Sequence, residues 1–194
     1  MVLGILGSGS GSNMQAILDA LDAGTLAARI AIVLSDNPDA FILERARRCG
    51  ITTGVIDCGG LRTKFPEAAQ ADTAARLRAA GVDLVCLAGF LRLVKRPLLD
   101  AFPGRILNIH PALLPAFPGL EAWCQALAAG VSETGCTVHV VDEGMDTGPI
   151  VLQQRVPVLP GDTPASLHAR IQIAEHHLYP AAITMLANQL PGSD

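Results

Sequence analysis

Two polar side chains close an apolar run in the middle of the chain. The segment Arg105-Ile106-Leu107-Asn108-Ile109-His110-Pro111 places Asn108 and His110 two residues apart, so both side chains point to one face of an extended strand. An amide donor beside an imidazole suits the polarisation of a carbonyl and the transfer of a proton. The alternative is a hydrogen-bonded structural pair at a strand end. No nucleophile elbow lies nearby, so we do not expect covalent catalysis.

An acidic loop follows later in the chain, Asp142-Glu143-Gly144-Met145-Asp146-Thr147-Gly148-Pro149. For Asp142 and Glu143 the favoured interpretation is a solvated turn. The ligand spacing and flanking helices of a calcium-binding EF-hand are missing, so we expect no calcium loop. Asp146 is a functional candidate only if it lies near His110, because a carboxylate beside His110 would orient the imidazole and favour its protonated form.

A glycine-rich loop opens the chain, Gly7-Ser8-Gly9-Ser10-Gly11-Ser12-Asn13. Its glycines allow close backbone approach, and the helix expected to start there offers free N–H groups and a positive dipole end to one phosphate. The alternative is a tight turn in which Ser12 or Asn13 caps the helix. The loop is neither a dinucleotide fingerprint nor a Walker A motif. Asp36 and Asp39 could be ribose ligands, but they could equally well cap a helix.

The elements that must hold these residues follow a strand–helix rhythm. Continuous apolar runs, typical of strands covered on both faces, lie at residues 2–6, 30–34, 53–57, 84–88 and 105–109. Helix-like segments lie at residues 13–23, 40–49 and 65–80. This pattern predicts an α/β fold with a Rossmann-like, doubly wound and mostly parallel sheet. Runs at residues 135–141 and 149–158 predict an antiparallel hairpin after the fifth strand, and residues 163–188 a closing helix.

Composition excludes several classes of protein. The chain has 194 residues, 50% of them hydrophobic and 16% charged, with a net charge of −4. We therefore expect one domain with a substantial core, no non-specific binding of nucleic acid, and no membrane-spanning segment. Five cysteines without a CxxC pair, and an N-terminus without a leader-like pattern, indicate reduced thiols in a cytoplasmic protein with no disulfide framework and no zinc site.

Taken in this order, the three motifs resemble those of the glycinamide ribonucleotide formyltransferase family. The most specific stretches are residues 107–119, LNIHPALLPAFPG, and residues 142–150, DEGMDTGPI. The resemblance covers nearly the whole chain and implies formyl transfer from 10-formyltetrahydrofolate to the amine of glycinamide ribonucleotide in purine biosynthesis. It implies a single domain over residues 1–194, with a phosphate-binding half at about 1–100 and a folate-binding, catalytic half at about 101–190. No metal is implied.

The resemblance also implies roles for individual residues. In the catalytic trio, Asn108 donates to the developing oxyanion while His110, paired with Asp146, stabilises that charge and moves protons. The residues implied to bind the ribonucleotide are Gly11, Ser12, Asn13, Gln172 and Glu175. Those implied to bind the folate are Phe90, Leu91, Arg92, Leu93, Val94, Val141, Asp142 and Asp146. One departure is Glu121, which stands where the family commonly carries histidine.

Other interpretations remain. Formyltetrahydrofolate hydrolase and methionyl-tRNA formyltransferase use a similar trio, but we expect neither the regulatory domain of the first nor the RNA-binding domain of the second. A sensor of folate or nucleotide would not need a proton-handling trio. We expect small-molecule partners only and a monomer or homodimer. His139 and His168 are interpreted as structural. His176 and His177 are interpreted as surface or capping groups rather than metal ligands, and Arg45 as part of a solvated helix face.

Overall fold

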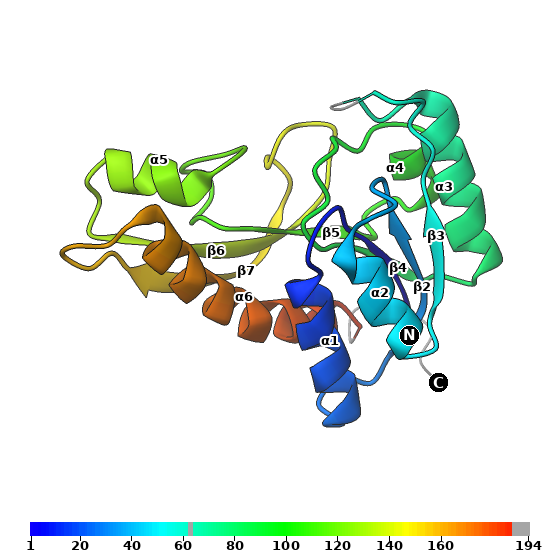
Figure 1. The fold of residues 1–194 in the computed structure, drawn as a ribbon, viewed down its shortest axis with the longest axis horizontal. Helices are drawn as coiled ribbons and strands as arrows, with labels where there is room; N and C mark the ends of the chain where they lie inside the picture. Colours follow the sequence, from blue (N-terminus) through cyan, green and yellow to red (C-terminus); the bar gives the residue numbers. More distant parts are fainter. Residues whose placement is uncertain (62–63, 188–194) are drawn as a thin grey trace.

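The strands of the described residues join in one sheet. The computed structural model describes residues 1–61 and 64–187, and the strand order is β3-β2-β1-β4-β5-β6-β7 (Figure 1). The parallel strands are β1 (Val2–Leu6), β2 (Arg29–Ser35), β3 (Thr52–Val55), β4 (Leu84–Leu87) and β5 (Ile106–His110). The antiparallel strands are β6 (Glu133–Val140) and β7 (Ile150–Pro157). The predicted mostly parallel sheet with a hairpin after the fifth strand is confirmed.

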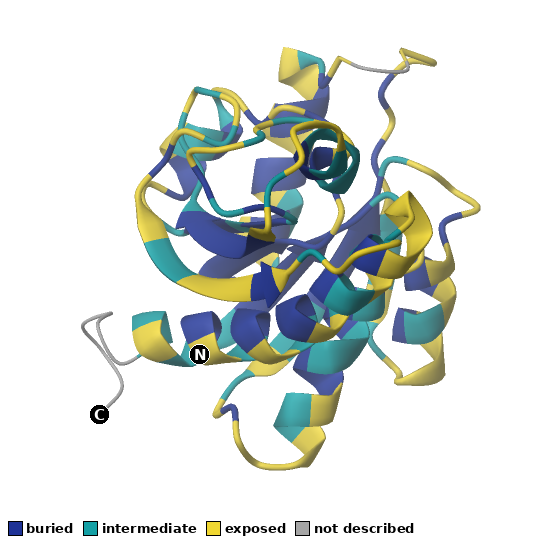
Figure 2. Cartoon of the chain, turned by 90° about the vertical axis from the view of Figure 1, so that its left-hand side faces the viewer, coloured by how far each residue is buried: buried dark blue, intermediate teal, exposed yellow. Residues whose placement is uncertain are grey.

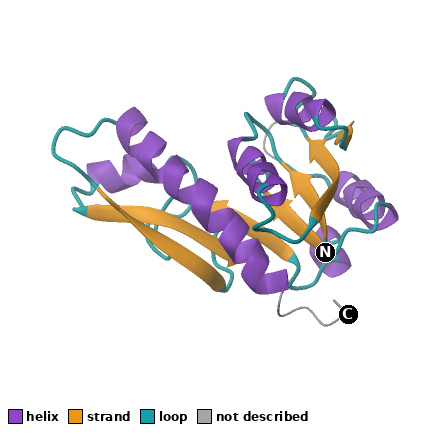
Figure 3. Ribbon diagram, turned by 90° about the horizontal axis from the view of Figure 1, so that it is seen from below, coloured by secondary structure: helices purple, strands orange, loops and turns teal. Residues whose placement is uncertain are grey.

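Helices cover both faces of this sheet (Figure 3). One core cluster joins the sheet to α1 (Ser12–Asp22), α2 (Phe41–Arg48) and α6 (Pro164–Ala187), and the other joins it to α3 (Glu67–Ala79) and α4 (Leu98–Ala101). The helix α5 (Ala122–Ala128) packs beside α6. The sequence did not predict α4 and α5, because helices of four and seven residues are too short to show a periodic pattern. Asn188, the last residue of the predicted closing helix, lies outside the described residues.

The core lies between the sheet and these helices (Figure 2). Tyr179 of α6 is fully buried, and its hydroxyl donates to the carbonyl oxygens of Leu87 and Leu107 at 3.0 and 3.1 Å. These carbonyls belong to β4 and β5, so one side chain ties the last helix to the middle of the sheet. Over the described ranges, no helix is both long and apolar enough to cross a membrane.

The strand order also places the ligand-binding edge. From β1, successive strands are added on one side of the sheet as far as β3, and β4 then lies on the other side of β1. The switch point of the topology is therefore between β1 and β4. In open α/β sheets, the crevice at the carboxyl ends of strands beside such a switch point is where ligands bind. The loops that follow β1, β4 and β5 carry the glycine-rich loop, residues 90–94 and the residues after His110. The fold therefore brings the glycine-rich loop, residues 90–94 and the Asn108–His110 segment to one edge of the sheet.

Candidate functional site

The structure brings Asn108, His110 and Asp146 together. Asn108 and His110 stand on β5, and Asp146 comes from the loop between β6 and β7. The Nδ1 atom of His110 lies 3.3 Å from Oδ2 of Asp146, and Nδ2 of Asn108 lies 3.5 Å from Oδ1 of the same carboxylate. One carboxylate therefore contacts both polar residues of the strand.

His139 is a fourth member of this group, and the sequence analysis missed it. The register of β5 and β6 pairs it with Asn108, and its Nε2 atom lies 3.2 Å from Nδ2 of Asn108 and 3.5 Å from Oδ1 of Asp146. The sequence analysis assigned His139 only a structural role, whereas the structure places it in contact with two residues of the predicted catalytic trio. The sequence signal was that His139 and Thr137 lie two residues apart on a predicted strand of the hairpin, so both face the same side of that strand. We call Asn108, His110, His139 and Asp146 the polar cluster.

Burial and neighbouring polar groups together set the pKa values of His110 and Asp146. Burial lowers the pKa of His110, although the Asp146 charge and the Phe117 carbonyl both act to raise that pKa. Asp146 does act to favour the imidazolium form of His110, as expected from the sequence, but burial has the larger effect on the pKa. Burial raises the pKa of Asp146, but hydrogen bonds from His139 and from the Gly119 N–H, with the nearby imidazole charges, bring that pKa below its usual value.

The loops on either side of the cluster hold one another. The Nε2 atom of His110 lies 2.8 Å from the carbonyl oxygen of Phe117, which can only accept, so this nitrogen is the donor. The Gly119 N–H donates to Oδ2 of Asp146 at 2.8 Å. Within the described part of the chain, the non-glycine residues with left-handed backbones are Phe117 (φ 56), Glu121 (φ 52) and Asp146 (φ 56). Each costs of order 1–3 kcal/mol, so the surroundings of the cluster hold strained backbone in place.

The glycine-rich loop, residues 7–13, forms the second part of the site and is called the phosphate loop below. Gly11 is the N-cap of α1 at φ 74, and no side chain caps the helix, so the interpretation of Ser12 or Asn13 as cap is wrong. A Cβ on Gly11 would lie 2.9 Å from the Cα atom of Ile42, so this position requires glycine. The uncapped N–H groups of α1 remain available to an anion.

A buried carboxyl group lies beside this loop. Nδ2 of Asn13 donates to Oε2 of Glu175 at 2.9 Å, while Oδ1 of Asn13 is buried with no hydrogen-bond partner in the structure. Burial raises the pKa of Glu175 to about 7, and the Asn13 bond opposes that rise. Gln172 precedes Glu175 by three residues, so both lie on one face of α6.

Residues 90–94, which the resemblance implies bind the folate and which are called the folate segment below, follow β4. Phe90 and Val94 are buried, whereas Leu91 and Leu93 are 67% and 40% exposed. The Arg92 side chain is buried and paired with Asp36, so its guanidinium is not free. Asp36 is therefore neither a cap nor a free ribose ligand, and the N-cap of α2 is Ala40 rather than Asp39. The Asp142 carboxylate accepts hydrogen bonds from Gly144 and Thr147 within its own loop.

One cavity of about 590 Å³ joins these parts. Among its walls are all the site residues expected from the sequence except Asp142, together with His139, Glu121, Trp123 and His168. His168 stacks on Trp123 with ring centroids 3.7 Å apart and planes 9° apart, and burial lowers the pKa of His168. The cavity thus spans the phosphate loop, the folate segment and the polar cluster.

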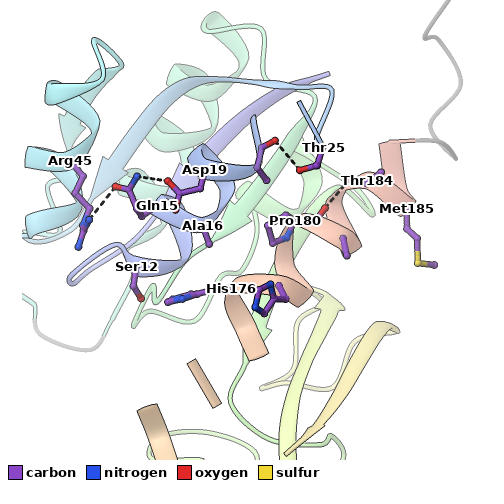
Figure 4. Close-up of a pocket in the computed structure, with 13 residues that line it drawn as sticks. Ser12, Gln15, Ala16, Asp19, Thr25, Arg45, His176, Pro180, Thr184 and Met185 are labelled. Atoms are coloured by element: carbon purple, nitrogen blue, oxygen red, sulfur yellow. Dashed lines mark hydrogen bonds between the residues drawn. The ribbon is translucent and has the colours of Figure 1, made fainter. Parts of the chain in front are cut away.

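A second groove lies between α1 and α6, outside the polar cluster (Figure 4). It measures about 800 Å³ and shares only Ser12 with the predicted site. Arg45 reaches it from α2, donating to the Ser10 carbonyl at 2.9 Å and to Gln15 Oε1 at 3.1 Å. Arg45 therefore braces the phosphate loop instead of lying on a free solvated face. Across residues 1–61 and 64–187, no group of three or more His, Cys, Asp or Glu residues is placed to hold a metal ion.

Comparison with known proteins agrees with this arrangement. Residues 1–183 match the family described as formyl transferase. The crystal structure of glycinamide ribonucleotide transformylase 1 from Symbiobacterium toebii is 54% identical with a TM-score of 0.93, covering 97% of this chain and 88% of that chain. Phosphoribosylglycinamide formyltransferase from Escherichia coli (strain K12) is 40% identical over 184 residues, covering 95% of this chain and 86% of that protein.

A longer relative matches over the same region. The trifunctional purine biosynthetic protein adenosine-3 of Drosophila melanogaster is 46% identical over 186 residues, which is 95% of this chain. The chain spans only 14% of the length of that relative. The match to the family covers nearly the whole of the present sequence, at identities that leave no doubt about common descent, and the chain belongs to the formyl transferase family.

Proposed function

We propose that this chain transfers a formyl group from 10-formyltetrahydrofolate to the amine of glycinamide ribonucleotide, a reaction of purine biosynthesis. The observation that carries the proposal is the single cavity that joins the phosphate loop to the polar cluster. An anion-binding end and a proton-handling end in one cavity suit a small phosphorylated acceptor. The names of the similar enzymes from Escherichia coli and Symbiobacterium toebii support the same acceptor.

The acceptor would bind at the phosphate loop. Backbone N–H groups of Gly11, Ser12 and Asn13 would bind its phosphate at the positive end of α1. Glu175 keeps one carboxyl oxygen beyond its bond from Asn13, and with a pKa of about 7 it can donate to or accept from a ribose hydroxyl near neutral pH. Gln172 adds an amide on the same helix face.

The formyl donor would bind at the folate segment and the loop of residues 141–146. The exposed side chains of Leu91, Leu93 and Met145 line this end of the cavity, and such apolar surface fits a flat ring system. Backbone groups of the folate segment would read the polar edge of the ring. The donor supplies the formyl carbon and the nitrogen that leaves it.

The polar cluster would then act on the reaction between the two substrates. The acceptor amine forms a bond to the formyl carbon, the bond from that carbon to N10 of the folate breaks, and one proton passes from the amine to N10. Asn108 donates from Nδ2 to the oxygen that gains negative charge, and His110 stabilises the same charge. Asp146 orients His110, and His139 contacts the same carboxylate and the Asn108 amide. Direct transfer of this kind needs positioning and charge stabilisation.

The test is an absorbance assay of folate turnover with and without glycinamide ribonucleotide. Turnover that requires the ribonucleotide supports the proposal. Turnover without it would mean transfer to water, which is the reaction of formyltetrahydrofolate hydrolase. Binding of both compounds by calorimetry without any turnover would mean a sensor, and would contradict the proposed roles of Asn108, His110 and Asp146.

A further inference from the structure

A buried ion pair connects the loops at the carboxyl edge of the sheet. Nε of Arg92 donates to Oδ2 of Asp36 at 2.5 Å, and the two side chains are 7% and 9% exposed. The Ser8 hydroxyl donates to Oδ1 of Asp36 at 2.6 Å. Ser8 follows β1, Asp36 follows β2 and Arg92 follows β4. One carboxylate therefore links three loops that are far apart in sequence.

This connection continues into the backbone of the folate segment. The Leu91 N–H donates to the Ser8 hydroxyl at 3.0 Å, and the Ser8 N–H donates to the Gly89 carbonyl at 3.0 Å. Arg92 also donates to the carbonyl oxygens of Leu61 and Lys64 in the loop after β3. Ser8 belongs to the phosphate loop, so it joins the loop that would hold the ribonucleotide to the segment that would hold the folate.

The folate segment has few other means of keeping its shape. It belongs to no helix or strand, and the side chains of Leu91 and Leu93 face solvent. Its apolar anchors are Phe90 and Val94 at its two ends. The polar contacts of Ser8, Asp36 and Arg92 act on its middle, where backbone groups would contact the folate. An apolar pair in place of the ion pair would fill the space but would not fix the direction of these groups.

We propose that Asp36 is a positioning residue which, through Ser8 and Arg92, holds the backbone of the folate segment in the geometry that binds the formyl donor, and ties it to the phosphate loop. This inference rests on the proposed function, because it assigns the donor to that segment. Asp36 itself does not line the cavity and lies outside the polar cluster. Its loss should therefore weaken donor binding while the chemical step continues.

The experiment compares Asp36→Asn and Ser8→Ala with wild type in the formyl-transfer assay. An asparagine keeps the shape of Asp36 but puts an amide donor or a neutral oxygen against Arg92. We expect the KM for 10-formyltetrahydrofolate to rise about tenfold or more, in line with the loss of a hydrogen bond between charged groups. For Asp36→Asn, the KM for glycinamide ribonucleotide and kcat at saturating donor should change by less than about threefold. Ser8→Thr, which keeps the hydroxyl, should restore donor KM toward wild type.

A matched control is Glu44→Gln, which breaks the exposed Glu44–Arg48 pair on α2. If Asp36 acts only on stability, Asp36→Asn will melt at a lower temperature yet show wild-type KM values below that temperature, and this result would overturn the inference. Should Asp36→Asn not fold, the donor KM of Ser8→Ala decides instead, and a wild-type donor KM in that variant would overturn the inference.

Calorimetric titration with tetrahydrofolate separates this inference from the proposed function. If wild type shows no ribonucleotide-dependent transfer but binds tetrahydrofolate more tightly than Asp36→Asn does, the proposed function fails while Asp36 still positions the segment. Equal binding by the two proteins refutes the role of Asp36, whatever the assay shows.

Discussion

The substitution Asp146→Asn tests the centre of the proposed mechanism. Asparagine has the shape of aspartate, so its Oδ1 can still accept the Gly119 N–H that Asp146 accepts at 2.8 Å, and the loop need not move. The change removes the negative charge that lies 3.3 Å from His110 Nδ1 and 3.5 Å from His139 Nε2, and it puts an amide NH2 in place of the oxygen that faces Nδ2 of Asn108. Its effect on activity therefore reports the charge and the orientation of the imidazole.

The size of the effect follows from those distances. A unit charge about 4 Å from another is worth about 4 kcal/mol at the effective dielectric constant of about 20 that fits protein sites. If this interaction acts on the charged transition state, its loss lowers kcat by about 10³-fold. Because Asp146 acts to raise the pKa of His110, the substitution also lowers that pKa further. The limb of the pH–rate profile that belongs to His110 should then move to lower pH.

The assay is ribonucleotide-dependent formyl transfer measured over a range of pH, with thermal melting to check that the variant folds. The control Asp72→Asn makes the same chemical change at an exposed site on α3 and should behave as wild type. Asp146→Ala also removes the acceptor for Gly119, so any further loss relative to Asp146→Asn reports the anchoring of the loop. An Asp146→Asn enzyme with kcat within about threefold of wild type would refute the proposed role of the charge.

Three further predictions concern other parts of the molecule. Burial raises the pKa of Glu175 in the folded state from the ordinary value of 4.5 to about 7, so the free energy of unfolding of the wild type falls as pH rises between these values. In urea unfolding, Glu175→Gln should be more stable than wild type by up to roughly 3 kcal/mol at pH 8 and no more stable at pH 4.5. His139→Ala removes the imidazole beside Asn108 and Asp146 and should lower kcat by about 10²-fold with little change in either KM, and an unchanged kcat would leave His139 with a structural role only. Tyr179→Phe leaves the carbonyl oxygens of Leu87 and Leu107 without that donor and should lower the free energy of unfolding by about 1–3 kcal/mol in urea titrations while kcat stays the same; equal stability would mean that water replaces the hydroxyl.

Much of the scaffold could be predicted because its signals are local. The apolar run at residues 2–6 matches β1, the predicted strand at 84–88 is one residue longer than β4, and the one at 105–109 is shifted by one residue from β5. The alternation of strands and helices then limits the topology to a few choices, of which the doubly wound sheet is one. The placement of the polar cluster at the carboxyl edge follows from the same rule.

What could not be predicted depends on contacts between distant segments. The role of His139 requires the register of β5 and β6, and a slip of one residue would turn its side chain to the other face of the sheet. The pairing of Asp36 with Arg92 joins residues 56 positions apart, and no spacing rule brings them together. The pKa of His110 likewise depends on how deeply the folded chain buries it, and that burial outweighs the rise caused by Asp146.

The polar cluster has only four side chains, but long stretches of sequence around them are needed to hold them in position. Asn108, His110 and His139 stand on adjacent strands, whose pairing fixes them, but Asp146 lies in a loop at φ 56. Its carboxylate is held by the N–H of Gly119, and the neighbouring Phe117, also left-handed, accepts a hydrogen bond from His110. The loop of Gly119 therefore holds Asp146 in place, and His110 of β5 holds Phe117 in place. Residues 107–119 and 142–150 are needed together because the position of one carboxylate depends on both.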